Sequence, residues 1–325
     1  MSLKNRVVVI TGASSGIGRA AALRFAAKRA SLVLAARSQE ELDAVAAQCR
    51  ELGSDALVVA TDVTDADAVQ VLASRAVQRF GRIDVWVNDA SVGFYSPFLD
   101  APIEDFRRVL DVNVMGYVHG ARAALGVMRA QGEGVLVNVA SIAGEIAMPY
   151  ASAYSMSKAA VRAMAGSLRN ELRLEGVRGV KIATVLPGTV DTPFFENAAN
   201  YTGRRVLAMP PVNSVDRVAR AVVSAAIAPR REIAVGTGAH ALVRQHRMTP
   251  KLIDGVLSAQ VDRTHLSTTE PAPPTSGNLY RPSGEVAGHG TDGGWGGRRR
   301  TAVRRVLGVG LLVGGGAYLV RRWGR

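Results

Sequence analysis

The sequence has little of what disulfide-bonded, exported or metal-binding proteins require. It contains a single cysteine, Cys49, so no disulfide can form within the chain, which suits a reducing cytosol. Residues 1–10 lack the apolar core and the small-residue cleavage site of a signal peptide. The five histidines show no metal-ligand spacing. We therefore expect the body of the protein to be cytoplasmic and to hold no metal.

Basic residues are in excess, but the excess lies at one end of the chain. The formal net charge is +13. Residues 276–325 contain nine Arg against one Asp and one Glu, a net charge of +7. The body carries only the remaining +6, spread over alternating signs. The charge therefore gives no reason to expect nucleic-acid binding by the body.

Short apolar, β-branched runs alternate with helical patterns over about the first 190 residues. This alternation predicts an α/β fold with a doubly wound parallel sheet of the Rossmann type, about seven strands with helices on both faces. The expected strands are Arg6–Ile10, Ser31–Ala36, Ala56–Ala60, Ile83–Val87, Gly134–Val139, Lys181–Leu186 and Glu232–Val235.

Capping patterns and breaks in composition predict the other boundaries. Ser38–Glu41 is a capping box, and Thr64–Asp67 resembles a second cap. Further helix is expected from Ser214 to Ile227 and over 238–263, with an interruption at Pro250. We expect a catalytic domain over 1–265, a flexible or extended Pro/Gly-rich linker over 266–300, and an Arg-flanked apolar tail over 301–325.

Tyr154 and Lys158 lie four residues apart in a helical pattern, so they share a helix face. A nearby positive charge lowers the pKa of a phenol, which would make Tyr154 a tuned acid or base for proton transfer. Taken alone, the pair also fits a solvated helix face.

A glycine-rich turn, Thr11-Gly-Ala-Ser-Ser-Gly-Ile-Gly18, follows the first strand and opens a helix. Glycines let the backbone turn sharply, and a helix N-terminus presents free N–H groups to a pyrophosphate. The turn could simply be tight, but its place in a βαβ unit favours a dinucleotide.

The glycine spacing, together with Tyr154-x-x-x-Lys158, resembles the short-chain dehydrogenase/reductase family. Asn88-Asp-Ala-Ser91 stands where that family usually has Asn-Asn-Ala-Gly, and Asp89 and Ser91 depart from it. Asn113, Ser141 and Pro187-Gly188 match further family positions. The resemblance covers about residues 4–236.

The resemblance implies an enzyme that interconverts a secondary alcohol and a ketone with a nicotinamide cofactor. Tyr154 is then the general acid/base, Lys158 lowers its pKa and binds the nicotinamide ribose, Ser141 holds the substrate oxygen, and Asn113 supports a water-linked proton relay. A homodimer or homotetramer is expected through the helix that carries Tyr154 and its neighbour. The implied cofactor-binding residues are Gly12, Ser14, Ser15, Gly16, Ile17, Gly18, Arg37, Asp62, Val63, Asn88, Ala90, Tyr154, Lys158, Pro187, Gly188 and Thr192.

Arg37 bears on which nicotinamide is used. In dinucleotide folds an acidic residue after the second strand binds the adenine-ribose 2′-hydroxyl, and here that strand ends in Arg37. A guanidinium suits a 2′-phosphate, so we expect NADP(H) to be preferred over NAD(H). The other interpretation is that Arg37 is an ordinary surface residue.

One segment bears on the choice of substrate. Residues 190–211 contain Phe194, Phe195, Tyr201, Leu207 and Met209, which could form an apolar lid over a lipophilic substrate or could simply anchor a loop.

Val306–Val320 is uncharged and flanked by arginines, which favours a membrane contact; a disordered or protein-docking tail is the alternative. A regulatory or scaffold protein that binds NADP(H) at a membrane, without catalytic activity, is the alternative function.

Overall fold

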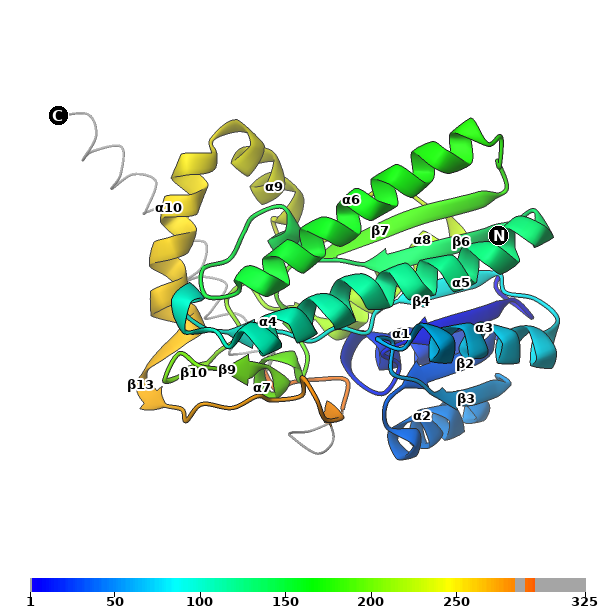
Figure 1. Ribbon diagram of the computed structural model, residues 1–325, viewed down its shortest axis with the longest axis horizontal. Coiled ribbons are helices and arrows are strands. Elements are labelled where there is room, and N and C mark those ends of the chain that lie inside the picture. The colour runs from blue at the N-terminus through cyan, green and yellow to red at the C-terminus, as the bar shows by residue number, and fades with distance from the viewer. Residues whose placement is uncertain (1, 284–289, 296–325) are drawn as a thin grey trace.

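Seven parallel strands form the central sheet of the computed structural model, which describes residues 2–283 and 290–295. The strand order is β12-β7-β6-β4-β1-β2-β3, so the predicted doubly wound α/β fold is confirmed (Figure 1). The strands are β1 Val7–Thr11, β2 Ser31–Ala36, β3 Ala56–Ala60, β4 Val85–Asn88, β6 Gly134–Val139, β7 Val180–Pro187 and β12 Ile233–Val235.

Helices cover both faces of this sheet. The α-helices are α1 Gly16–Ala26, α2 Gln39–Glu51, α3 Ala66–Phe80, α4 Ile103–Leu110, α5 Gly116–Gln131, α6 Ser152–Leu174, α7 Phe194–Asn197, α8 Val215–Ile227, α9 Ala239–Met248 and α10 Pro250–Gln260. Short 3-10 helices span Phe98–Asp100 and Ile142–Gly144, and π-helical turns span Asp111–Met115 and Val261–His265.

Two apolar layers hold the helices on the sheet. Alanine, valine and leucine side chains of α1, α2 and α8 pack on one face, and those of α3, α5 and α6 pack on the other. The strands are apolar on both sides, which is why they read as continuous hydrophobic runs. Trp86 of β4 and Phe25 of α1 are fully buried in these opposite layers.

The strand order reverses beside β1, and this reversal positions the site. The chain runs from β1 outward to β2 and β3, then returns so that β4 pairs with the other edge of β1. In open α/β sheets, ligands bind at the carboxyl ends of the strands at such a reversal.

Local signals agree with most predicted helix boundaries. Ser38 caps α2 by accepting a hydrogen bond from the Glu41 N–H, as the capping box predicts. The second cap is one residue later than expected, because the Asp65 carboxylate, and not Thr64, accepts the N–H groups of Asp67 and Ala68. Thr64 instead bonds to Asp62.

The segment expected to be a flexible or extended linker contacts the body at several points among its described residues. Strand β13 (Leu266–Pro271) pairs antiparallel with β10 (Arg204–Val206), Leu279 is fully buried, and Trp295 packs with Val212. Short two-residue strands complete the fold: β5 Phe94–Tyr95 with β9 Ala199–Asn200, and β8 Val190–Asp191 with β11 Asn213–Ser214.

The expected tail, 301–325, lies outside the described residues. Within the part of the chain that the structure describes, no helix combines the length and the apolar character needed to cross a bilayer.

Candidate active site

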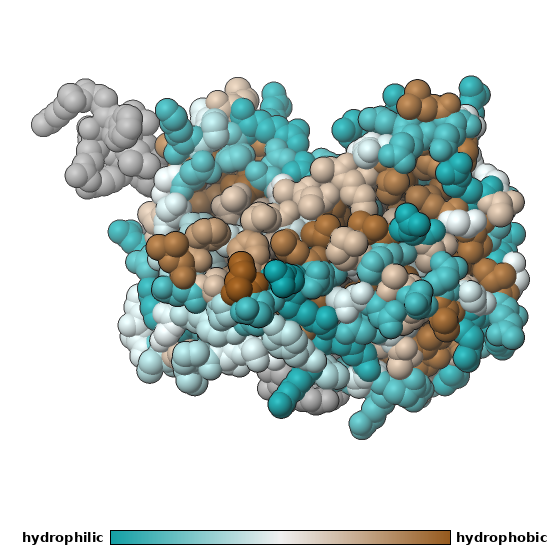
Figure 2. Space-filling view, viewed as in Figure 1, coloured by the Kyte–Doolittle hydropathy of each residue, from teal (hydrophilic) through white to brown (hydrophobic). Residues whose placement is uncertain are grey.

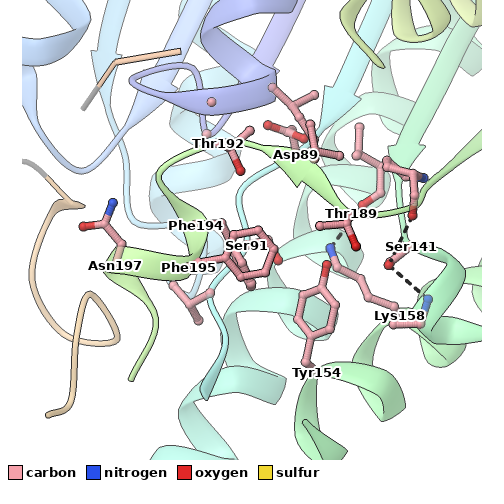
Figure 3. A pocket seen from close by; sticks show the side chains of 18 of the residues that line it. Asp89, Ser91, Ser141, Tyr154, Lys158, Thr189, Thr192, Phe194, Phe195 and Asn197 are labelled. Carbon is pink, nitrogen blue, oxygen red and sulfur yellow. Dashed lines mark hydrogen bonds between the residues drawn. The ribbon is translucent and has the colours of Figure 1, made fainter. Parts of the chain in front are cut away.

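A cavity of about 370 Å³ opens at the carboxyl ends of the central strands (Figure 3). Its wall runs from the glycine-rich turn, past the ends of β2 and β3, to the segment around α7 and to helices α9 and α10. It includes every predicted site residue except Gly18, Asn88 and Asn113. A cavity of this size is in the range that binds small molecules.

The glycine-rich turn has the shape of a phosphate cradle. Gly12 and Gly16 have φ angles of +73° and +50°, and a Cβ at Gly12 would lie 2.7 Å from the Ala90 nitrogen. Gly18 does not line the cavity; its α-carbon packs against the turn, where a Cβ would lie 2.2 Å from the Gly12 oxygen. Ser15 precedes α1 without capping it through its side chain, and the first turn has no acidic residue. These features fit a dinucleotide pyrophosphate.

Helix α6 presents both Tyr154 and Lys158 to the cavity, and the Tyr154 hydroxyl points toward the Lys158 ammonium group (Figure 3). Lys158 is buried, with Nζ 3.1 Å from the Val139 oxygen and 3.3 Å from the Tyr117 hydroxyl. Its Nζ lies 5.5 Å from the centre of the Tyr154 ring. The predicted helix-face pairing is therefore present, although the direct hydrogen bonds of the ammonium group go to other partners.

The protonation of this pair differs from the sequence-based expectation. Burial raises the pKa of Tyr154 to about 12, while a hydrogen bond with Ser141 acts in the opposite direction. The net shift is upward and not downward as expected, because burial outweighs the hydrogen bond with Ser141. Tyr154 is thus a protonated acid at neutral pH.

Asp89 contributes a charge that the family pattern does not predict. Burial raises the pKa of the Asp89 carboxyl and lowers the pKa of the Lys158 ammonium, and the charge of each partner opposes the shift of the other. The departure from Asn at this position therefore supplies a carboxylate that favours the charged form of Lys158.

Ser141 lies close to Tyr154 and is the second residue after β6 (Figure 3). Its Oγ accepts a hydrogen bond from the Ala143 nitrogen at 3.0 Å and lies 3.4 Å from the Pro187 oxygen. The hydroxyl is thereby fixed at the end of a strand, where it can bind the same oxygen that Tyr154 protonates.

Two of the predicted asparagines lie behind the cavity wall. Asn113 sits in the π-helical turn and is fully buried; its side chain pairs with both the N–H and the carbonyl of Val92, and its Nδ2 lies 3.1 Å from the Ser157 Oγ. Asn88 donates to Asn138 Oδ1 at 3.0 Å and joins β4 to β6. Both side chains position the wall of the cavity; their predicted contacts with a relay water and with the cofactor stay predictions.

At the far end of the cavity, Arg37 and Asp62 follow β2 and β3. Burial raises the pKa of Asp62, but hydrogen bonds from Thr64 and Arg108 outweigh it, so the net shift is downward. Arg108 Nη2 lies 2.9 Å from Asp62 Oδ2. The guanidinium of Arg37 binds main-chain carbonyls of residues 278–281.

Sequence patterns missed the outer wall of the cavity. Within the described residues, Leu242, Leu257, Gln260 and His265 complete this wall from the C-terminal part of the chain. Burial lowers the pKa of His265 to about 4, so its imidazole is neutral and Nδ1 can donate to the Leu207 oxygen. Only the tertiary fold brings these residues to the site, because their spacing carries no catalytic signal.

The predicted lid segment is partly at the cavity. Phe194, Phe195 and Met209 line it, and the Phe194 ring lies 5.4 Å from that of Tyr154. Tyr201 instead donates to Asp105, and Leu207 packs against Trp295.

Comparison with known proteins identifies the family. Residues 6–202 match the family model described as short chain dehydrogenase. The chain belongs to the short-chain dehydrogenase family. It is 34% identical over 299 residues to the uncharacterized oxidoreductase YxnA of Bacillus subtilis, a similarity that covers 90% of this chain and 83% of that protein.

Solved structures of this family are similar to the chain. One is a short-chain dehydrogenase/reductase from Burkholderia phymatum in complex with NAD (TM-score 0.70, 31% identity, 78% of this chain and 96% of that one). Another is an alcohol dehydrogenase from the archaeon Thermococcus sibiricus complexed with 5-hydroxy-NADP (TM-score 0.61, 27% identity, 70% of this chain and 95% of that one). The chain is therefore an oxidoreductase with a nicotinamide cofactor site. Among its described residues, no cluster of His, Cys, Asp or Glu could hold a metal ion.

Proposed function

We propose that this short-chain dehydrogenase is an NADP(H)-dependent oxidoreductase that interconverts a secondary alcohol and a ketone. The observation that carries the proposal is the convergence of Tyr154, Ser141 and Lys158 in one cavity that is continuous with the glycine-rich turn. A binding module has no evident need for a phenol, a hydroxyl and an ammonium group arranged around one point of its cofactor cavity.

In the reducing direction, a nicotinamide cofactor held along the glycine-rich turn would supply a hydride to the carbonyl carbon and would itself be oxidised. Tyr154 donates its proton to the carbonyl oxygen, so a ketone, one hydride and one proton give the alcohol. The Ser141 hydroxyl holds that oxygen during the transfer. The Lys158 ammonium stabilises the phenolate left on Tyr154 and binds the nicotinamide ribose, and Asn113 supports the relay that returns a proton. Oxidation of an alcohol is the reverse.

The proposed preference for NADP(H) rests on Arg37 at the end of β2, where an acidic residue would favour NAD(H). Replacing Arg37 with leucine removes charge-assisted bonds to a 2′-phosphate, so kcat/KM with NADPH should fall about tenfold or more, with NADH little affected. Arg50→Leu is the matched control, because Arg50 also donates to a carbonyl, that of Ala56, but does not line the cavity. If Arg37→Leu leaves the ratio of kcat/KM with NADPH to kcat/KM with NADH unchanged, the proposed preference is refuted.

The proposed substrate is lipophilic. The outer part of the cavity is lined largely by apolar side chains, Ile146, Met148, Phe194, Phe195, Met209, Leu242 and Leu257. Burying such surface against a ligand contributes about 25 cal/mol per Å². A screen of ketones and alcohols of increasing apolar size, run with NADPH and NADP⁺, tests this assignment; a preference for small, polar substrates would contradict it.

We also propose a homodimer or homotetramer formed through α5, α6 and their neighbours. Figure 2 shows hydrophobic side chains on the face that carries α4, α5 and α6. Ile103, Met115 and Met156 are 64%, 44% and 52% exposed there. A monomeric mass in solution would count against this assembly.

A membrane contact through the apolar segment 306–320 is part of the proposal, on sequence grounds alone. The full chain should fractionate with membranes, whereas a chain ended after Gly297 should not. This end point keeps Trp295, whose backbone N–H donates to the Asp191 carboxylate. Equal distribution of the two proteins between the membrane and the supernatant would refute the proposed membrane contact.

A further inference from the structure

Residues 275–283, which we call the strap, cross from the substrate end of the cavity to its adenine-ribose end. Thr275 exchanges main-chain hydrogen bonds with Asn200, and the Asn278 N–H donates to the Asn197 oxygen at 2.8 Å. Leu279 is fully buried in the core layer formed by α3, α5 and α6. The strap is therefore docked by backbone bonds at one end and by a buried side chain in its middle.

The strap occupies the donors of Arg37. Arg37 Nη2 lies 2.7 Å from the Asn278 oxygen and 2.6 Å from the Arg281 oxygen, and Nη1 lies 3.2 Å from the Leu279 oxygen. A guanidinium presents its five N–H groups in one planar fork. Carbonyl oxygens of the strap thus occupy the fork that a 2′-phosphate would use.

Helix α4 anchors the same stretch independently of Arg37. The Tyr280 hydroxyl lies 2.7 Å from Asp105 Oδ1, and Arg108 Nε lies 3.0 Å from the Leu279 oxygen. Asp105 is buried, and its other oxygen accepts a hydrogen bond from Tyr201, which belongs to the body of the protein. Two tyrosines therefore share one carboxylate, and only one of them belongs to the strap.

We infer that residues 278–281 are a cofactor-specificity determinant that competes with the 2′-phosphate of NADP(H) for Arg37. This inference rests on the proposed role of Arg37. NADP(H) must displace three carbonyl oxygens to reach the guanidinium, whereas NAD(H) has only a hydroxyl there and does not need Arg37. The apparent affinity for NADP(H) is therefore the intrinsic affinity multiplied by the undocked fraction of the strap, and by reciprocity NADP(H) binding releases the strap.

A second contact of the C-terminal region should not discriminate between the cofactors. The Gly16 N–H, at the start of α1, donates to the Gly290 oxygen at 3.1 Å. A pyrophosphate would bind at this helix end, and both dinucleotides carry one. Selectivity is thus assigned to the Arg37 contact alone.

The test compares two ligands that differ only by a 2′-phosphate, adenosine 2′,5′-bisphosphate and AMP, by calorimetry on the full chain. Tyr280→Phe removes the strap's bond to Asp105 and should tighten the bisphosphate about tenfold while leaving AMP within about twofold. Tyr201→Phe, the matched control, removes the other bond to the same carboxylate and should change neither affinity. An unchanged or weaker bisphosphate affinity in Tyr280→Phe would overturn the inference.

A second variant loosens the strap by another route. Gly277 has a φ of +50°, and a Cβ there would lie 2.3 Å from the Asn197 oxygen. Gly277→Ala should therefore also favour the bisphosphate over AMP. In the unaltered protein, NADP⁺ should speed hydrogen exchange at the amides of 276–281, and NAD⁺ should not; slower exchange with NADP⁺ would overturn the inference.

These outcomes also separate the inference from the function on which it rests. If no variant binds the bisphosphate more tightly than AMP, both the 2′-phosphate role of Arg37 and the competition fail. If Arg37→Leu abolishes a bisphosphate preference that neither Tyr280→Phe nor Gly277→Ala increases, the role of Arg37 stands and the competition alone is refuted.

Discussion

Tyr154→Phe is expected to lower kcat for carbonyl reduction by about 100-fold to 10,000-fold. The substitution removes only the hydroxyl that donates the proton and keeps the ring that packs 5.4 Å from Phe194. NADPH binding should change by less than about threefold, because the loss lies in the chemical step. Stopped-flow measurement of the hydride step, alongside NADPH titration by fluorescence, separates these two quantities.

Tyr95→Phe is the matched control for this variant. Tyr95 is another buried tyrosine that lines the same cavity, so the same hydroxyl is removed from the same surroundings. Its turnover should stay within about threefold of the unaltered enzyme. Comparable losses in the two variants would show that a phenol supports the cavity in general and that Tyr154 has no special role as the acid.

Lys158→Met is expected to lower kcat/KM by about 100-fold or more, because it removes a buried ammonium group beside the acid while keeping an unbranched side chain. Two buried acceptors, the Val139 carbonyl and the Tyr117 hydroxyl, lose a donor. Thermal unfolding of the variant must therefore be measured beside its kinetics. Activity close to that of the unaltered enzyme in a folded variant would contradict the assigned role of Lys158.

The pH dependence tests the same ammonium group through Asp89. Burial lowers the pKa of Lys158 below its ordinary value of 10.5, and the Asp89 charge opposes this shift. Because the ammonium is charged below its pKa, kcat/KM should fall as the pH rises through the lowered pKa of Lys158. This decrease at high pH should be missing in Lys158→Met. Asp89→Asn removes the opposing charge, so the decrease in kcat/KM should move to lower pH. If kcat/KM falls at the same pH in Asp89→Asn as in the unaltered enzyme, the proposed effect of Asp89 on the pKa of Lys158 is contradicted.

The central sheet could be predicted from the sequence because its strands are buried on both faces. Ser31–Ala36, Ala56–Ala60 and Gly134–Val139 have the predicted bounds, since each apolar run ends at a turn signal. The site residues at the ends of these strands follow from the parallel topology, which brings carboxyl ends to one edge of the sheet.

The C-terminal part of the site could not be predicted in this way. β13 has the sequence LSTTEP, which is mostly polar, and becomes a strand by pairing with β10, about sixty residues earlier in the chain. Pro- and Gly-rich composition suggested a flexible or extended linker for the strap, whereas buried Leu279 and the Asp105–Tyr280 bond hold it in place. Such contacts depend on long-range partners that local patterns do not reveal.

The direction of the Tyr154 pKa shift could not be predicted from the sequence either. Spacing alone shows that an ammonium group can stand near the phenol, but the extent of burial decides which effect is larger. In the structure burial raises the pKa to about 12, which keeps the Tyr154 hydroxyl protonated at neutral pH and makes it a weaker acid than a free phenol.

The most direct test of the central claim is hydride transfer itself. The full chain is incubated with NADPH carrying deuterium at both C4 positions and a panel of lipophilic ketones, and the products are analysed by mass spectrometry. We expect a secondary alcohol with one deuterium on the carbinol carbon, formed by the unaltered enzyme and lost in Tyr154→Phe. NADPH binding without labelled alcohol from any ketone, and without oxidation of the matching alcohols by NADP⁺, would contradict it.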